Sequence, residues 1–144
     1  MAVKFRRLAE GYWVAPQITA GDVKEAAAMG VALIVNNRPD GEEPGQPSGA
    51  SIEEAARVAG IDYVSIPFVR ANVTDAQVAE LEAALANAKG PILAYCRSGT
   101  RSTAIRALAL AKAGRNIADL IDEAADAGYD LSSLRPRLEA MAAR

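Results

Sequence analysis

The sequence predicts an α/β fold: a single domain over residues 1–144 with a central, mainly parallel sheet flanked by helices. Three observations predict it. Short apolar runs alternate with helical stretches along the chain, an order typical of a parallel sheet. Capping residues and glycines mark most of the helix ends. The chain has 144 residues, of which 51% are hydrophobic, enough for one compact core but too few for two ordinary domains.

Strands are expected in the N-terminal piece and in three later runs. The piece from Phe5 to Val14, with a turn at Glu10-Gly11, is expected to add a hairpin at one edge of the sheet. The later runs are short, apolar and rich in β-formers, so we expect strands that are buried on both faces. They cover residues 31–35, 63–67 and 92–95.

Helices are predicted from their end signals. Thr19, Ser51 and Thr74 each stand three residues before an Asp, Glu or Gln, which is the pattern of a capping box. Glycines stand where these helices and the one after residue 102 should stop, at positions 30, 60, 90 and 114. The predicted helices lie near 20–29, 51–59, 75–88 and 102–113.

Two more helices are expected after Gly114. Asn116 is expected to cap the first, which ends by Gly128, and the second lies near 135–143. Both are expected to cover the sheet, with Arg135 and Arg137 on the solvated surface.

Three loops are expected to meet at one edge of the sheet. Ligands of open parallel sheets bind beyond the carboxyl ends of the strands, and there the sequence places the loops 36–49, 67–74 and 96–101. The 36–49 loop is long for a strand-to-helix connection and carries charge. Its composition fits an ordinary solvated loop and a functional one equally well.

The only cysteine, Cys96, stands where a buried strand turns into a helix. Gly99 follows three residues later and Arg101 five residues later. The amides of such a loop, the N-terminal dipole of the next helix and a forked guanidinium all stabilise a thiolate and the anion that it attacks. A lone cysteine is more often a small buried hydrophobe, but that role needs none of these neighbours. The pattern therefore predicts a reactive nucleophile.

Composition excludes several kinds of chemistry. The chain has no histidine and one cysteine, which excludes an intrachain disulfide, Cys-His or Ser-His-Asp catalysis and the common zinc sites. No metal and no cofactor are predicted. The net charge is −2 with scattered basic residues, so neither a nucleic-acid nor a membrane partner is expected. No signal-like apolar core follows Met1, and a cytoplasmic location is expected.

The chain resembles the bacterial family named for the phosphatase-like domain of beta-lactamase hydrolase-like proteins, described both as phosphatases and as sulfur transferases. The likeness runs from Ile18 to Leu110 and rests on the segments 37–43, 60–67 and 90–102. The cysteine loop alone also resembles that of single-domain rhodaneses, which carry a cysteine persulfide. The wider chain resembles the tyrosine and dual-specificity phosphatases. These resemblances imply a phosphatase-like fold with the active-site loop between a strand and a helix.

Three departures from the phosphatase pattern favour sulfur chemistry. Four residues separate Cys96 from Arg101, whereas the phosphatase pattern has five, and Tyr95 replaces the usual histidine. A smaller loop suits a persulfide sulfur better than a phosphoryl group. The 67–74 loop, where a phosphatase is expected to carry its general acid, has no carboxylate before Asp75.

The sequence therefore predicts a sulfurtransferase that forms a Cys96 persulfide from a small anionic donor, such as thiosulfate or a small persulfide, and passes the sulfur to a thiol acceptor. One alternative is a cysteine-dependent phosphatase that acts on a phosphorylated substrate through a phosphocysteine. Its acid would come from the 36–49 loop, whose candidate substrate or acid residues are Arg38, Asp40, Glu42 and Glu43. A second alternative is a non-catalytic module that binds anions or senses redox state.

Each residue of the loop has an expected role. Cys96 and Arg101 are the predicted catalytic residues, with Arg101 binding the anionic end of the donor. The anion-binding loop comprises Arg97, Ser98, Gly99, Thr100 and Ser102. Within it, Arg97 is expected to face outward and recruit anions, and Ser102 is expected to cap the helix and hydrogen bond to the sulfur.

Overall fold

The computed structural model describes residues 4–70 and 72–144, so Met1 to Val3 of the predicted domain and Ala71 of the 67–74 loop lie outside the described residues. A five-stranded sheet has the order β1-β2-β5-β3-β4. β1 is antiparallel to β2, and every other neighbouring pair is parallel. The strands are β1 (Arg6–Ala9), β2 (Tyr12–Ala15), β3 (Leu33–Asn36), β4 (Asp62–Ser65) and β5 (Ile92–Tyr95). The predicted α/β fold and its edge hairpin are thus confirmed.

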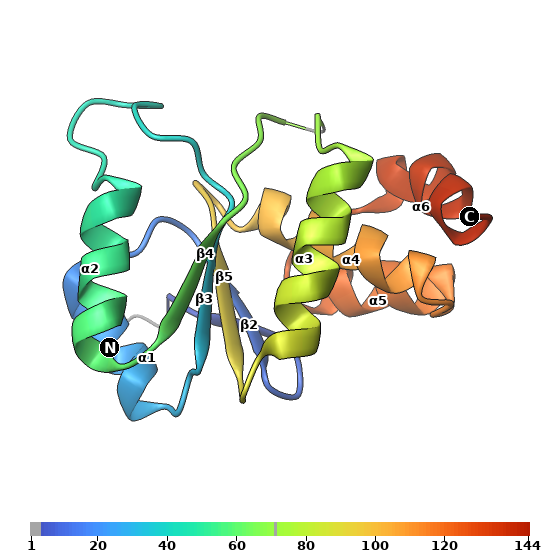
Figure 1. Ribbon diagram of the computed structural model, residues 1–144. Coiled ribbons are helices and arrows are strands. Elements are labelled where there is room, and N and C mark those ends of the chain that lie inside the picture. Colours follow the sequence, from blue (N-terminus) through green and yellow to red (C-terminus); the bar gives the residue numbers. More distant parts are fainter. Residues whose placement is uncertain (1–3, 71) are drawn as a thin grey trace.

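Helices cover both faces of the sheet. α1 and α2 lie on one face, and α3 to α6 lie on the other (Figure 1). Their bounds are α1 (Ala20–Ala28), α2 (Gly49–Ala59), α3 (Asp75–Asn87), α4 (Thr100–Lys112), α5 (Ile117–Asp126) and α6 (Arg135–Ala142), with a 3-10 turn, η1 (Ser132–Leu134), before the last. Each connection between parallel strands runs through one of α1, α2 and α3, as is usual for a parallel sheet.

The central strands alternate between two cores. On β3 and β5, Ile34 and Leu93 belong to the cluster under α1 and α2, whereas Val35 and Ala94 belong to the cluster under α3 and α4. A strand with period two presents successive side chains to opposite faces. β5 is buried along its whole length, so the residue that follows it, Cys96, starts from a rigid position.

Three of the predicted helix starts are confirmed. Thr19 and Thr74 form reciprocal capping boxes with Asp22 and Gln77. Asn116 accepts a hydrogen bond from an amide in the first turn of α5.

The predicted cap at Ser51 is wrong. α2 starts two residues earlier than expected, because Ser48 caps it and Ser51 lies in its first turn. Both serines suit a cap, and the tertiary contacts of the 36–49 loop select the first: Asp40 accepts a hydrogen bond from the Gly49 amide at 2.8 Å.

Two further expectations need correction. β4 is the edge strand of the sheet, and none of its residues is fully buried, so the run 63–67 is not a strand covered on both faces. α4 starts at Thr100 after a left-handed Gly99, so Ser102 does not cap it. A glycine reaches this conformation without the steric cost that a side chain would add.

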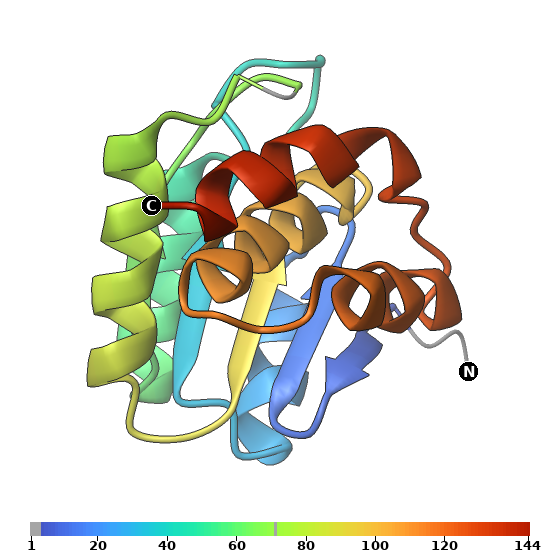
Figure 2. The same cartoon turned by 90° about the vertical axis from the view of Figure 1, so that its right-hand side faces the viewer.

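The C-terminal helices differ from the expectation that both cover the sheet. α5 contacts β1, whereas α6 packs across α4 as an outer layer (Figure 2). Arg137 is half-buried and donates a hydrogen bond to the Val73 carbonyl. The prediction that Arg137 lies on the solvated surface is therefore wrong, while Arg135 is exposed as expected.

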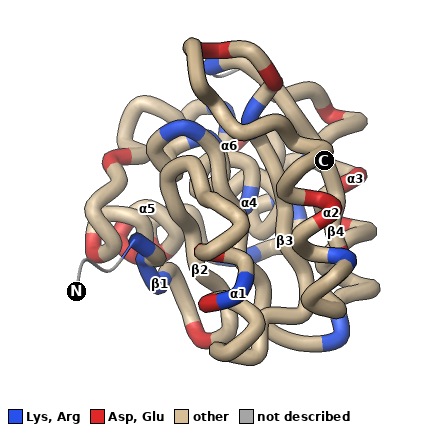
Figure 3. The backbone as a smooth tube through the Cα atoms, turned by 90° about the vertical axis from the view of Figure 1, so that its left-hand side faces the viewer, with Lys and Arg blue, Asp and Glu red and all other residues tan. Residues whose placement is uncertain are grey.

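Charged side chains of both signs are intermixed over the backbone (Figure 3). Among the described residues, no helix combines the length and apolar character that crossing a bilayer requires.

Candidate active site

The three predicted loops meet above the end of β5, as the parallel topology requires. Arg101, in the first turn of α4, reaches the other two loops. Its guanidinium donates two hydrogen bonds to the Glu42 carboxylate of the 36–49 loop, at 2.9 and 2.8 Å, and one to the Phe68 carbonyl of the 67–74 loop, at 2.9 Å. One side chain thus joins loops that are far apart in the sequence.

Cys96 lies at the base of this junction. Its amide donates to the Ala15 carbonyl of the neighbouring strand at 3.3 Å, which fixes the backbone at the end of β5. Only 1% of the residue is exposed, and the Gly99 amide donates to its Sγ at 3.1 Å. The sulfur is therefore held inside the loop with an amide N–H directed at it, an arrangement that stabilises negative charge on sulfur.

The first turn of α4 supplies further donors. The first amides of any helix lack an acceptor within that helix and carry the positive end of its dipole. Gly99 leads into this turn with a φ of 99°. Thr103 closes the turn, because its hydroxyl donates to the Gly99 carbonyl at 2.8 Å. The loop thus has the local geometry of an anion-binding site.

Ser102 lies inside α4 rather than at its cap. Its side chain is fully buried, and its hydroxyl has no hydrogen-bond partner among the described residues. The structure therefore does not show the expected hydrogen bond from Ser102 to the sulfur. A buried hydroxyl without a partner is costly.

Glu42 is the central acceptor of the site. Besides Arg101, its carboxylate accepts a hydrogen bond from Arg38 at 2.8 Å. The hydrogen bonds from Arg101, aided by Arg38 and opposed by burial, lower the pKa of Glu42 to about 2. In return, the hydrogen bond to Glu42 raises the pKa of Arg101, and the charge of a Cys96 thiolate adds to that rise. Glu42 is therefore a fixed anion near neutral pH, not a general acid.

Replacing Glu42 with Gln is expected to make stability less dependent on pH. A carboxylate whose pKa falls on folding stabilises the native state above its ordinary pKa, and this gain is lost as pH falls from about 4.5 towards 2. The gain is on the order of 3 kcal/mol at most. We expect Glu42→Gln to be less stable at pH 7 and to approach the wild type at pH 3, as measured by urea unfolding.

The matched control for this prediction is Glu54→Gln. Glu54 also pairs with an arginine, Arg57, but both side chains are largely exposed, and such pairs contribute little to stability. An equal loss in the two variants, or a Glu42→Gln deficit that does not change with pH, would contradict the role given to Glu42.

The other candidates of the 36–49 loop also make polar contacts within the site. Arg38 is 2% exposed and donates to Glu42, to Glu43 and to Gln17, the last at 3.0 Å. Asp40 is engaged at the start of α2. The structure thus brings Glu42 and Glu43 to the cysteine loop, and the contacts of Arg38 and Asp40 hold the 36–49 loop in place.

The outer residues of the cysteine loop are less constrained. Arg97 has a side chain that is 63% exposed, and its guanidinium lies 3.6 Å from the Glu43 carboxylate. It faces outward, as expected. The Ser98 hydroxyl donates to the Thr100 hydroxyl at 3.0 Å, so these two side chains stiffen the turn.

Three contributors were not predicted from the sequence. Gln17 binds Arg38, the Phe68 carbonyl binds Arg101, and the Tyr129 hydroxyl donates to the Ser98 carbonyl at 3.1 Å. The Phe68 carbonyl belongs to the main chain, so the residue type at this position does not predict its role as an acceptor. Gln17 and Tyr129 are distant in sequence from their partners and belong to no recognisable motif.

Replacing Gly99 with Ala is expected to destabilise the protein and to lower any activity of the loop. Its φ of 99° disfavours a side chain, and a Cβ at this position would overlap the Tyr129 hydroxyl. We expect a loss of about 2 kcal/mol from strain and the broken Tyr129 contact, measurable by urea unfolding. Gly114→Ala is the control, because Gly114 has the same φ with nothing within 4 Å of the new Cβ. Equal losses would mean that Tyr129 does not shape the loop.

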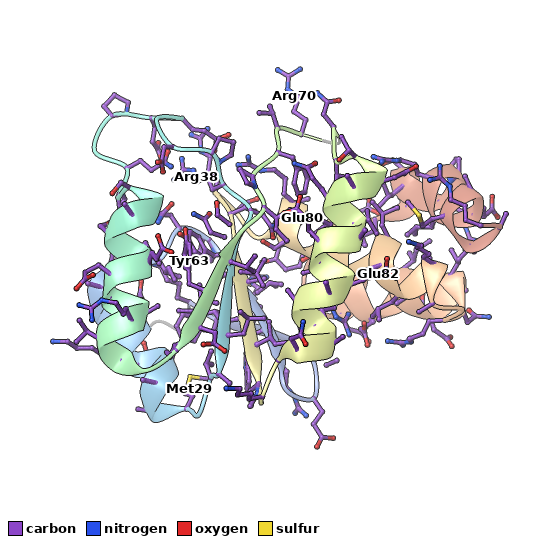
Figure 4. All side chains as sticks on the ribbon, viewed as in Figure 1. Met29, Arg38, Tyr63, Arg70, Glu80 and Glu82 are labelled. Atoms are coloured by element: carbon purple, nitrogen blue, oxygen red, sulfur yellow. The ribbon has the colours of Figure 1, made fainter. Side chains whose placement is uncertain are left out.

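A hollow of about 340 Å³ opens beside this junction and is lined by Arg70, Arg97, Arg101, Val69 and Glu42. Three guanidinium groups and one carboxylate give it a net positive lining, which suits an anionic substrate. Arg70 extends outward from its loop, whereas Arg38 is directed beneath the 36–49 loop (Figure 4).

Comparisons with known proteins agree with this fold. A beta-lactamase hydrolase-like protein of Agrobacterium fabrum is 36% identical over 142 residues, which cover 98% of this chain and 33% of that protein. The chain thus spans about a third of the length of this curated relative. A candidate phosphatase of Neisseria meningitidis has a crystal structure with a TM-score of 0.86 and 30% identity, covering 97% of this chain and 99% of that one.

More distant structures share the fold alone. Tk-PTP in its active form has a TM-score of 0.78 at 14% identity, covering 100% of this chain and 99% of that one. The sequence model of the phosphatase-like domain of beta-lactamase hydrolase-like proteins matches residues 4–114, which is more than half of the chain and includes every loop described above. The chain therefore belongs to the family of phosphatase-like domains of beta-lactamase hydrolase-like proteins.

Proposed function

We propose that this chain is a cysteine-dependent phosphatase for phosphate monoesters whose leaving group departs without strong acid assistance. One observation carries the proposal: Glu42 fixes the Arg101 guanidinium at the loop that encloses the Cys96 sulfur. The phosphatase-like fold and the phosphatase descriptions of similar structures support phosphoryl chemistry, and they favour it over the sulfur transfer that the loop length predicts.

The chemistry follows from the groups present. The Cys96 thiolate would attack phosphorus, so that an S–P bond forms as the bond from phosphorus to the ester oxygen breaks. The loop amides and Arg101 would stabilise the charge on the equatorial oxygens. Water would then cleave the phosphocysteine, releasing inorganic phosphate and restoring the thiol.

The substrate class follows from how the carboxylates near the loop are engaged, since Glu42 and Glu43 both pair with arginines. The 67–74 loop carries no carboxylate, Glu42 is held ionised, and Asp75 lies in the first turn of α3, where it pairs with Arg144. A phenolate leaves without full protonation, whereas an alkoxide needs a proton. Aryl phosphates are therefore the expected substrates.

Sulfur transfer is the second candidate, favoured by the four-residue spacing between Cys96 and Arg101. The thiolate would attack the sulfane sulfur of thiosulfate, forming an S–S bond to Cys96 as the bond to the sulfite sulfur breaks. A thiol acceptor would then take the outer sulfur. Sulfite and thiolate leave without a proton, so this reaction also tolerates the absence of an acid. A cytoplasmic setting, which would supply thiols, stays a prediction.

Intact-protein mass spectrometry after rapid acid quenching tests both candidates. The protein is mixed with 4-nitrophenyl phosphate in one arm and with thiosulfate in the other, and nitrophenolate release is followed in parallel. Turnover with a phosphoryl adduct on Cys96 supports the phosphatase. A sulfur adduct without phosphate turnover replaces it with the sulfurtransferase. Neither adduct, with no turnover in either arm, would leave only an anion-binding or redox-sensing role.

A further inference from the structure

A second pocket adjoins the cysteine loop, and its lining includes Ser98 but not Arg97. It encloses about 320 Å³, and six apolar side chains contribute to its wall: Phe68, Val73, Ala104, Leu108, Leu131 and Leu134. Ser98, Thr100 and Arg101 of the cysteine loop also line it. The pocket therefore begins at the anion-binding loop and continues into an apolar space.

The size and lining of this pocket fit a small organic group. Sites for small molecules have volumes from about 300 Å³ upward, with apolar walls and a few polar groups that fix orientation. Arg70 and Arg137 add cationic groups to the lining, opposed by Asp130 alone. Arg137 also donates to the Val73 carbonyl, which ties the C-terminal segment to the 67–74 loop and keeps this wall closed.

The outer wall comes from a part of the chain that the family match does not include. The match ends at residue 114, whereas Leu131 and Leu134 precede α6 and Arg137 lies in its first turn. Figure 2 shows α6 lying across α4, the helix that carries Arg101. One part of the pocket wall thus lies beyond the family match, whereas the cysteine loop and the rest of the wall lie within it.

We propose that this pocket holds an aryl group of the substrate while the attached anionic group binds at Arg101. The proposal rests on the proposed function, because it takes the cysteine loop as the reacting site. It adds a specificity determinant: the C-terminal segment, together with α4, selects aryl esters over inorganic and short-chain anions, through burial of the ring against Leu131, Leu134 and Ala104.

Binding of two unreactive probes, phenylphosphonate and methylphosphonate, tests this selection. Titration calorimetry on the whole chain is expected to show phenylphosphonate binding about tenfold more tightly. Ala104→Leu places a larger side chain in the pocket and should remove the preference. Ser133→Phe is the second variant, because Ser133 lines the pocket from an exposed position where a change does not threaten the core.

The matched control is Ala84→Leu. Ala84 is also a half-buried helical alanine, but it lines a different hollow beside α3. This control should keep the tenfold preference. Equal affinity for the two probes in the wild type, or a preference that persists in both pocket variants, would overturn the proposal.

Protection of Cys96 from iodoacetamide separates this proposal from the proposed function. If both probes protect the thiol equally well, the proposed function is supported and the proposal of an aryl pocket is wrong. A different result is that phenylphosphonate is preferred and the pocket variants remove that preference, but neither probe protects Cys96. In that case the aryl pocket is supported and the proposed function is wrong.

Discussion

Replacing Cys96 with serine is expected to abolish group transfer and to leave the fold intact. The thiol is the only side chain in the loop that forms a covalent adduct readily near neutral pH, because a serine hydroxyl without a neighbouring base is a weak nucleophile. Serine is nearly isosteric and can accept the hydrogen bond that the Gly99 amide gives to Sγ. The expected loss is on the order of a thousandfold or more, measured as nitrophenolate release and as adduct formation.

The same samples provide the control for folding. Circular dichroism and the urea midpoint should match those of the wild type, because Cys96 lies at a strand end whose backbone contacts do not use the sulfur. A variant that keeps a tenth of the wild-type turnover with an unchanged fold would show that Cys96 is not the nucleophile, and both catalytic candidates would fail.

The sequence was sufficient to predict the layout of the fold. Apolar runs separated by capped helices leave few arrangements for a parallel sheet, and the structure has the predicted strands within two residues at each end. The errors occur where local signals compete. Ser48 and Ser51 both suit the cap of α2, and only the tertiary contact at Gly49 decides between them. β4 itself has two apolar residues, fewer than β3 or β5, but the predicted run 63–67 also includes Ile66, so its composition did not reveal that the strand is exposed.

The location of the candidate site could be predicted from the sequence, but the contacts among its side chains could not. The loops that follow parallel strands lie at the same edge of the sheet. The sequence therefore predicted that the acidic segment 40–43 would lie near Cys96. Which acidic residue would reach Arg101 depends on the loop conformation, which Arg38 fixes from beneath through contacts with Glu42 and Gln17. Tyr129 lies 31 residues after Ser98, its partner in the cysteine loop, and no local sequence pattern predicts this contact.

The ion pairs also limit how the site can work. Arg101 already donates to Glu42 and to the Phe68 carbonyl, so an incoming anion must share the guanidinium instead of finding it unoccupied. A preorganised cation costs no reorganisation when the transition state forms. Glu42 is therefore a positioning residue. It keeps the Arg101 guanidinium oriented, but it also neutralises part of the positive charge of Arg101.

Replacing Arg101 with lysine is expected to lower the rate of transfer more than tenfold, about 1.4 kcal/mol of transition-state stabilisation. Arginine presents a planar fork that binds Glu42 with two nitrogens and still reaches the Phe68 carbonyl. A lysine ammonium is a single point charge that cannot satisfy both loops and an anion together. The loss should appear in kcat as well as in kcat/KM, because the missing interaction stabilises the transition state.

Arg97→Lys is the matched control, since it makes the same exchange in the same loop at a side chain that is 63% exposed. Its only ion pair given by the structure joins it to Glu43 at 3.6 Å, so its contribution is long-range attraction, which a lysine preserves. We expect Arg97→Lys to keep kcat and the salt dependence of kcat/KM, and Arg97→Ala to lose part of that salt dependence. Equal losses of kcat in Arg97→Lys and Arg101→Lys would show that the planar guanidinium of Arg101 does not stabilise the transition state. The loop amides alone would then provide that stabilisation.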